Sequence, residues 1–93
     1  MPGPELLARK PGTVNRVAGD KTLVMIPEKR TLHVLNESAG AVWAFLSEPR
    51  AEEAVVDELT RVFDCPRETA ARDVKEVLAK LDSLGLLVRK PGA

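Results

Sequence analysis

The sequence predicts an α+β fold in which a small antiparallel sheet precedes three helices. Residues 22–26 and 31–35 are rich in β-branched and apolar side chains and are joined by a short link, which favours a β-hairpin. Asn36 follows the second stretch and is a suitable helix N-cap. Apolar residues then recur at helical spacing, at Ala39, Val42, Trp43 and Leu46. A chain of 93 residues has room for one domain built from these parts.

The residues before the hairpin carry weaker signals. Residues 1–12 contain several prolines and glycines, and we expect them to form a flexible N-terminal arm. Residues 13–17 form a short extended segment, and residues 18–21 have the composition of a turn. The sheet therefore begins near residue 13.

Side-chain alternation assigns two faces to the strand at residues 31–35. Leu35 leads into the helix and should face the core, and a period of two places His33 and Thr31 on the same side. Leu32 and Val34 then point the other way, so the strand carries apolar residues on both faces. A sheet backed by solvent does not require this. We expect the outer face to be covered by a dimer mate, the N-terminal arm or a ligand.

Three helices are expected after the strands. The first runs from residue 37 to about 46, before Pro49, and the second from about 51 to 63. The third runs from Pro66, a favoured first helical residue, to about residue 84, where Gly85 suits a left-handed C-terminal stop. Residues 86–88 form either a last strand or a tail on the core, and residues 89–93 should fray.

Composition excludes several classes of function. Lys and Arg total 14, as do Asp and Glu, so a zero formal charge argues against binding nucleic acid or anionic lipid. The N-terminus lacks the apolar region of a signal peptide, and no apolar run is long enough to span a membrane. Cys65 is the single cysteine, which fits a reducing compartment. We therefore expect a cytoplasmic protein without a nucleic-acid or membrane partner.

Reactive side chains are sparse. The chain has one histidine, His33, one cysteine, Cys65, and no tyrosine, and the spacing of the two carries no signal of a nucleophile and base pair. One His, one Cys and scattered carboxylates are too few for a metal site. We predict that the protein is not an enzyme and holds no metal or cofactor.

Two binding functions stay open on these residues. A hairpin with three helices is compatible with a winged helix-turn-helix, but the exposed residues of the third helix alternate in sign, from Arg67 and Glu68 to Lys80 and Asp82. This pattern is typical of a solvated face rather than a DNA-reading one. The alternative is peptide capture, in which an extended peptide adds to an edge strand beside a long amphipathic helix. A structural homodimer without a peptide ligand would use the same apolar residues.

The residues from 24 to 39 resemble the PqqD-like family, the recognition elements and peptide chaperones of ribosomally made, post-translationally modified peptides. Residues 24–28 and 32–39 match its two strands, the Leu-Asn end and the small-residue helix start. The later segments 42–46, 58–64 and 73–87, with the Gly-Leu ending, match its three helices. The resemblance covers about residues 13–88. His33 departs from it, since relatives often carry an aromatic residue there, as does Pro49-Arg50 after the first helix.

The resemblance implies three N-terminal antiparallel strands, a three-helix bundle and no catalysis. It implies a peptide-binding domain at 13–88 that takes a precursor's leader peptide as an added strand and delivers it to a modifying enzyme: a radical enzyme, a cyclase or a leader peptidase. Free and dimeric forms are both compatible with it, because an exposed strand edge can also pair with itself. The matching contact residues are Thr31, Leu32, His33 and Val34 on the strand, and Val74, Lys75, Val77, Leu78 and Leu81 on or beside the helix.

Overall fold

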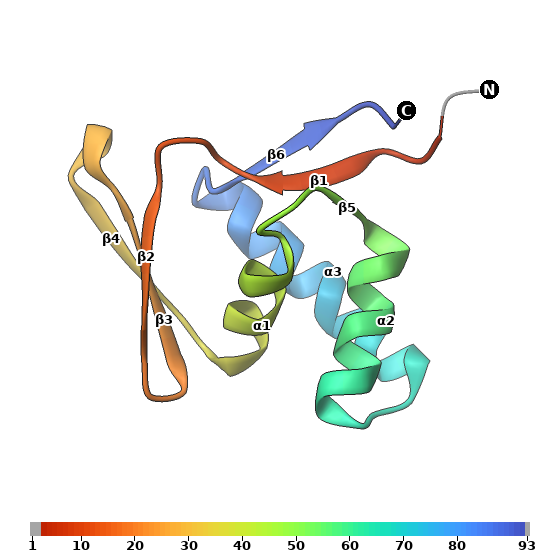
Figure 1. Ribbon diagram of the computed structural model, residues 1–93. Coiled ribbons are helices and arrows are strands. Elements are labelled where there is room, and N and C mark those ends of the chain that lie inside the picture. Colours follow the sequence, from red (N-terminus) through yellow and green to blue (C-terminus); the bar gives the residue numbers. More distant parts are fainter. Residues whose placement is uncertain (1–2, 93) are drawn as a thin grey trace.

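The computed structural model describes residues 3–92 and confirms the α+β class (Figure 1). Within this range the strands form two separate antiparallel sheets rather than one. We call them the open sheet and the terminal sheet. The open sheet comprises β2 (Val14–Ala18), β3 (Lys21–Ile26) and β4 (Thr31–Leu35), and the terminal sheet comprises β5 (Arg50–Ala51), β1 (Leu6–Arg9) and β6 (Leu87–Lys90). Three helices, α1 (Glu37–Phe45), α2 (Glu52–Phe63) and α3 (Arg67–Ser83), each match the expected range to within one residue at either end.

The open sheet is the predicted hairpin with one strand added before it. Its order is β2-β3-β4, so β3 is central and pairs Val14 with Met25 on one side and Val34 with Leu23 on the other. A short 3₁₀ turn, η1 (Pro27–Lys29), joins β3 to β4, and Arg30 closes it with a φ of 53°. The expected alternation in β4 is confirmed: Leu35 is buried, whereas Leu32 and Val34 are exposed.

Helix α1 begins where the sequence predicts. The Asn36 side chain accepts a hydrogen bond from the backbone N–H of Ala39 at 2.9 Å, which satisfies one of the free donors of the first turn. Gly40 lies against the open sheet so closely that a Cβ there would stand 2.6 Å from the hydroxyl oxygen of Thr22. The small residue therefore lets α1 pack directly on the inner face of β3.

Helices α2 and α3 complete the core. Asp64, at the end of α2, and Gly85, after α3, both adopt positive φ angles, 48° and 73°, which end the helices as expected for Gly85. The buried cluster joins the inner face of the open sheet, all three helices and the terminal sheet. Its largest fully enclosed side chains include Trp43, Leu35, Leu46, Leu59 and Leu81.

The terminal sheet differs from the sequence expectation at both ends of the chain. The expected flexible arm contains β1, whose Leu7 is 2% and Ala8 5% exposed, and only residues 1 and 2 of it lie outside the described range. The expected fraying tail contributes the last half of β6, up to Lys90, while residue 93 lies outside the described range. The two segments order each other, because Leu6 pairs with Lys90 and Arg9 with Leu87.

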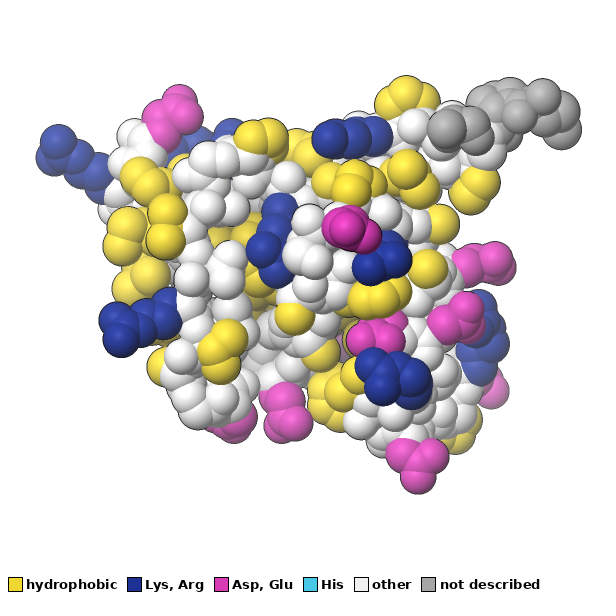
Figure 2. Space-filling view, in the orientation of Figure 1, with side chains coloured by type: hydrophobic (Ala, Val, Ile, Leu, Met, Phe, Trp, Pro, Cys, Tyr) yellow, Lys and Arg dark blue, Asp and Glu magenta, His cyan; other side chains and the backbone are white. Residues whose placement is uncertain are grey.

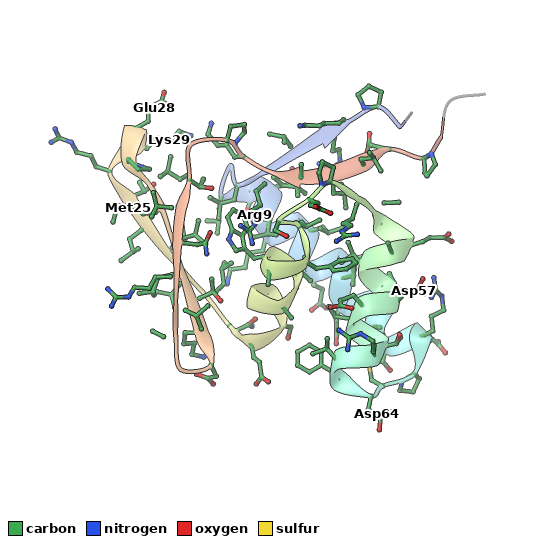
Figure 3. All side chains as sticks on the ribbon, in the orientation of Figure 1. Arg9, Met25, Glu28, Lys29, Asp57 and Asp64 are labelled. Carbon is green, nitrogen blue, oxygen red and sulfur yellow. The ribbon has the colours of Figure 1, made fainter. Side chains whose placement is uncertain are left out.

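Arg9 connects the terminal sheet to the rest of the fold (Figure 3). Its Nε donates to the carbonyl oxygen of Trp43 at 2.8 Å near the end of α1, and its guanidinium carbon lies 4.9 Å from the centre of the Trp43 ring. Its Nη1 reaches the side-chain oxygen of Asn15 in β2 at 3.4 Å. Partial burial lowers the pKa of the Arg9 guanidinium below its ordinary value. One side chain therefore links β1, α1 and β2.

Candidate functional site

Strand β4 forms one edge of the open sheet. It pairs with β3 along its full length from Thr31 to Leu35, and no other described strand pairs with its second side. Alternate N–H and C=O groups on that side can therefore accept a further strand, which is how extended peptides add to sheets. Strand β2 forms the other edge of the same sheet.

The residues that flank β4 on both sides lie near α3. At the end of β4, Asn36 lines a hollow with residues 73–80 of α3. At the start of β4, the ammonium of Lys29 in η1 lies 3.6 Å from the place where a Cβ on Gly85 would stand, just beyond the last turn of α3. The end of β4 thus lies near the middle of α3, and the turn before β4 lies near the C-terminal end of α3.

The hollow at the Asn36 end has a volume of about 220 Å³. One wall is the start of α1 and the other is α3, and the lining residues are Asn36, Ser38, Ala39, Asp73, Glu76, Val77 and Lys80. Val77 and Ala39 are its apolar lining residues, and of the two Val77 is the more exposed, at 8% against 1%. The carboxylates of Asp73 and Glu76 stand toward one end of the α3 wall and the ammonium of Lys80 toward the other.

The structure divides the predicted α3 contact residues into three groups. Val74 and Leu81 are fully buried in the core and have no surface to offer a ligand. Val77 lines the hollow beside the β4 end. Lys75 and Leu78 line a different hollow of about 320 Å³, on the side of α3 that faces α2 and β6, together with Glu52, Ala79, Asp82 and Arg89. The β4 residues Thr31, Leu32, His33 and Val34 are brought together on one edge as predicted.

The predicted contact set lacks Glu76 and Lys80, which lie on the side of α3 that faces the β4 end. Helical spacing identifies the buried stripe of α3, from Ala70 through Val74 to Leu81. Residues on both flanks of that stripe have the same local pattern. The packing of α3 against α1, α2 and β6 determines that the flank with residues 73, 76, 77 and 80 faces the Asn36 end of β4, so no local signal identifies Glu76 or Lys80.

The single histidine and cysteine belong to separate parts of the fold. His33 is half-buried on β4, and Cys65 is half-buried in the connection between α2 and α3. Across residues 3–92, His, Cys, Asp and Glu side chains form no group of three that could hold a metal ion. None of the helices described here is both long and apolar enough to cross a membrane.

The architecture combines a three-stranded sheet, whose edge strand β4 has both flanking residues near α3, with a three-helix bundle and a second small sheet. Comparison with known proteins places this architecture in a family. The family model described as "Coenzyme PQQ synthesis protein D (PqqD)" matches residues 21–87, from the start of β3 to the start of β6. The chain belongs to the PqqD family.

A solved structure shows the same fold. The chain described as "TbiB1 in Complex with the TbiA(beta) Leader Peptide" is 22% identical, with a TM-score of 0.76 over 86% of this chain and 93% of that one. At this identity the match establishes the fold. A search of curated proteins finds no match.

Proposed function

We propose that the protein binds the leader region of a ribosomally made precursor peptide, without catalysing a reaction, by accepting it as a strand on β4. The observation that carries this proposal is the free β4 edge beside α3, with a hollow where the strand ends. Membership of the PqqD family and the fold shared with TbiB1, whose structure contains a leader peptide, support it.

An added strand would present its side chains to two surroundings in alternation. One set would point inward toward α3, where Val77 offers an apolar contact. The other set would stand beside Leu32 and Val34 on the outer face of the sheet. Backbone hydrogen bonds to Thr31–Leu35 would supply affinity that does not depend on sequence, and the side-chain contacts would supply selectivity.

The charges along α3 give the bound peptide a preferred direction. Asp73 and Glu76 lie at the Asn36 end of β4, whereas Lys80 lies farther along α3, and Lys29 stands near Gly85 at the opposite end. A peptide with a basic side chain toward the carboxylates and an acidic side chain toward Lys80 would complement this order. We therefore replace Lys75 and Leu78 in the contact set by Glu76 and Lys80.

We propose that the domain at residues 13–88 binds the peptide. Its role in the cytoplasm would be to deliver this peptide to a modifying enzyme. A radical enzyme, a cyclase and a leader peptidase are the three classes of enzyme that would act on such a peptide. The terminal sheet supports this domain from behind, because Leu7 and Leu87 are buried in the same core as Leu35 of β4.

Titration of ¹⁵N-labelled protein tests the proposal. The probe is a synthetic leader peptide taken from a short precursor gene beside the gene for this chain. We expect the largest amide shifts in residues 31–35 and in the 73–80 segment of α3. Shifts confined to α2 would place the site elsewhere, and loss of β4 signals at high protein concentration without peptide would indicate that the edge pairs with a second copy.

A further inference from the structure

The outer face of the open sheet is apolar where solvent would favour polar side chains. Four of its residues are large and exposed: Val14 at 59%, Leu32 at 56%, Val34 at 54% and Met25 at 44%. Figure 2 shows hydrophobic atoms gathered along the flank of the molecule that the open sheet forms, and in Figure 3 Met25 points away from the helices. An apolar patch of this kind commonly marks an interaction surface.

The patch is continuous across the three strands. Register pairs Val14 with Met25 and Met25 with Leu32, so these side chains form a row across the sheet, and Leu23 and Val34 form a second row beside it. The face is also concave, with a hollow of about 280 Å³. Its lining residues are Val14, Asn15, Arg16, Leu23, Met25 and Leu32. A partner could therefore insert an apolar side chain here.

The charges on this face have one sign. Alternation places Arg16 of β2 and Lys21 of β3 on the same side as Leu23 and Met25, and both are exposed. None of the outward-facing positions in the described strands β2, β3 and β4 carries a carboxylate; Asp20 and Glu28 lie in the connecting turns. A second copy stacked on this face would bring like charges together, whereas a partner bearing Asp or Glu around an apolar centre would complement them.

The position of the patch indicates which partner this is. Leu32 and Val34 belong both to this face and to β4, the strand that receives the peptide. A peptide added to β4 would extend the sheet, and half of its side chains would join the same outer face. A protein bound to this face would therefore contact both this chain and the peptide bound to it.

We propose that the outer face of the open sheet docks the peptide-modifying enzyme through an apolar surface bordered by acidic side chains on that enzyme. The inference rests on the proposed role of β4 for the identity of the partner. The contact surface itself extends to β2 and β3, away from the edge that the peptide would occupy.

Two matched variants test the proposal. Met25→Ser removes an apolar side chain from the centre of the patch, and Val62→Ser removes one of nearly the same exposure, 45% against 44%, from α2. The bait is the purified modifying enzyme encoded beside the gene for this chain, and binding is measured by interferometry with and without the leader peptide. Met25→Ser should weaken enzyme binding about tenfold. Val62→Ser should leave it unchanged, and both variants should bind the leader peptide as the parent does.

Charge reversal and self-association complete the test. Arg16→Glu should also weaken enzyme binding, and the parent's affinity should fall as salt is raised. Equal enzyme binding by the Met25→Ser and parent proteins would overturn the proposal, as would a parent dimer in sedimentation that Met25→Ser dissociates. Failure of the parent to bind the leader peptide, with enzyme binding still sensitive to Met25→Ser, would overturn the function of β4 and leave the docking surface in place.

Discussion

Within residues 3–92 the two sheets have three strands each but differ in their surroundings. The terminal sheet buries Leu7, Ala8 and Leu87 against the helices. The open sheet buries one face through Val24, Ile26 and Leu35 and leaves the other apolar and exposed, with free edges at β2 and β4. The terminal sheet therefore mainly stabilises the core, whereas the open sheet leaves surface and strand edges exposed that a partner could bind.

Truncation of a leucine in each sheet should show the largest difference. Leu7→Ala removes a side chain that is 2% exposed and should lower the free energy of unfolding by about 3 kcal/mol, because it leaves a cavity in the core. Leu32→Ala, on the open sheet, should change it by about 0.5 kcal/mol or less. Urea denaturation of both variants gives the two values. Equal losses would show that the open sheet is as important for stability as the terminal one.

Arg9 tests whether the two sheets depend on each other. Arg9→Ala should cost about 2 kcal/mol, because it removes the hydrogen bond to the Trp43 carbonyl and the contact with the Trp43 ring. Arg16→Ala is the control, because Arg16 is an exposed arginine on strand β2. This substitution should leave the free energy of unfolding almost unchanged. Thermal unfolding followed by circular dichroism measures both. Similar melting temperatures for the two variants would remove Arg9 as a link.

Two lysines on α3 allow the peptide affinity of the two sides of this helix to be compared. Lys80 faces the β4 end and Lys75 faces the terminal sheet, and both are exposed. Lys80→Glu should weaken leader-peptide binding about tenfold through like-charge repulsion. The Lys75→Glu variant should bind the leader peptide as tightly as the parent protein does. Neither substitution should change the melting temperature much, because both lysines are exposed. Fluorescence anisotropy with labelled peptide measures the affinities; the reverse order would restore Lys75 to the contact set.

Asn36 should give the smallest effect, at the junction of the open sheet with α1. Asn36→Ala removes the cap of α1 and should cost about 1 kcal/mol in stability. It should also weaken peptide binding, because Asn36 lines the hollow at the end of β4. Asn36→Ser, which can still cap the helix, should recover most of the stability. An unchanged melting temperature in Asn36→Ala would show that the cap does not stabilise the junction.

The parts of the fold that could be predicted from sequence are those with local signals. The hairpin, the three helices, the Asn36 cap and the Gly85 stop each depend on residues within a few positions of one another. Strand β1 has no such signal, because the four residues Leu6–Arg9 become a strand by pairing with Arg50–Ala51 and with Leu87–Lys90, both of which are distant in sequence. The side of α3 that Lys75 faces also has no local signal, because the packing of α3 against α1, α2 and β6 determines which of its flanks lies near β4.

The pairing of Leu6 with Lys90 also has a consequence for the order of events during synthesis. Strands β2, β3 and β4 can form a sheet once residue 35 has left the ribosome. Strand β1 is made before any of them, yet it cannot complete its pairing until residue 90 exists. Leu7 and Ala8, which are buried in the folded protein, therefore cannot be fully enclosed until residues 87–90 have been made, whereas the open sheet depends on contacts that are closer in sequence.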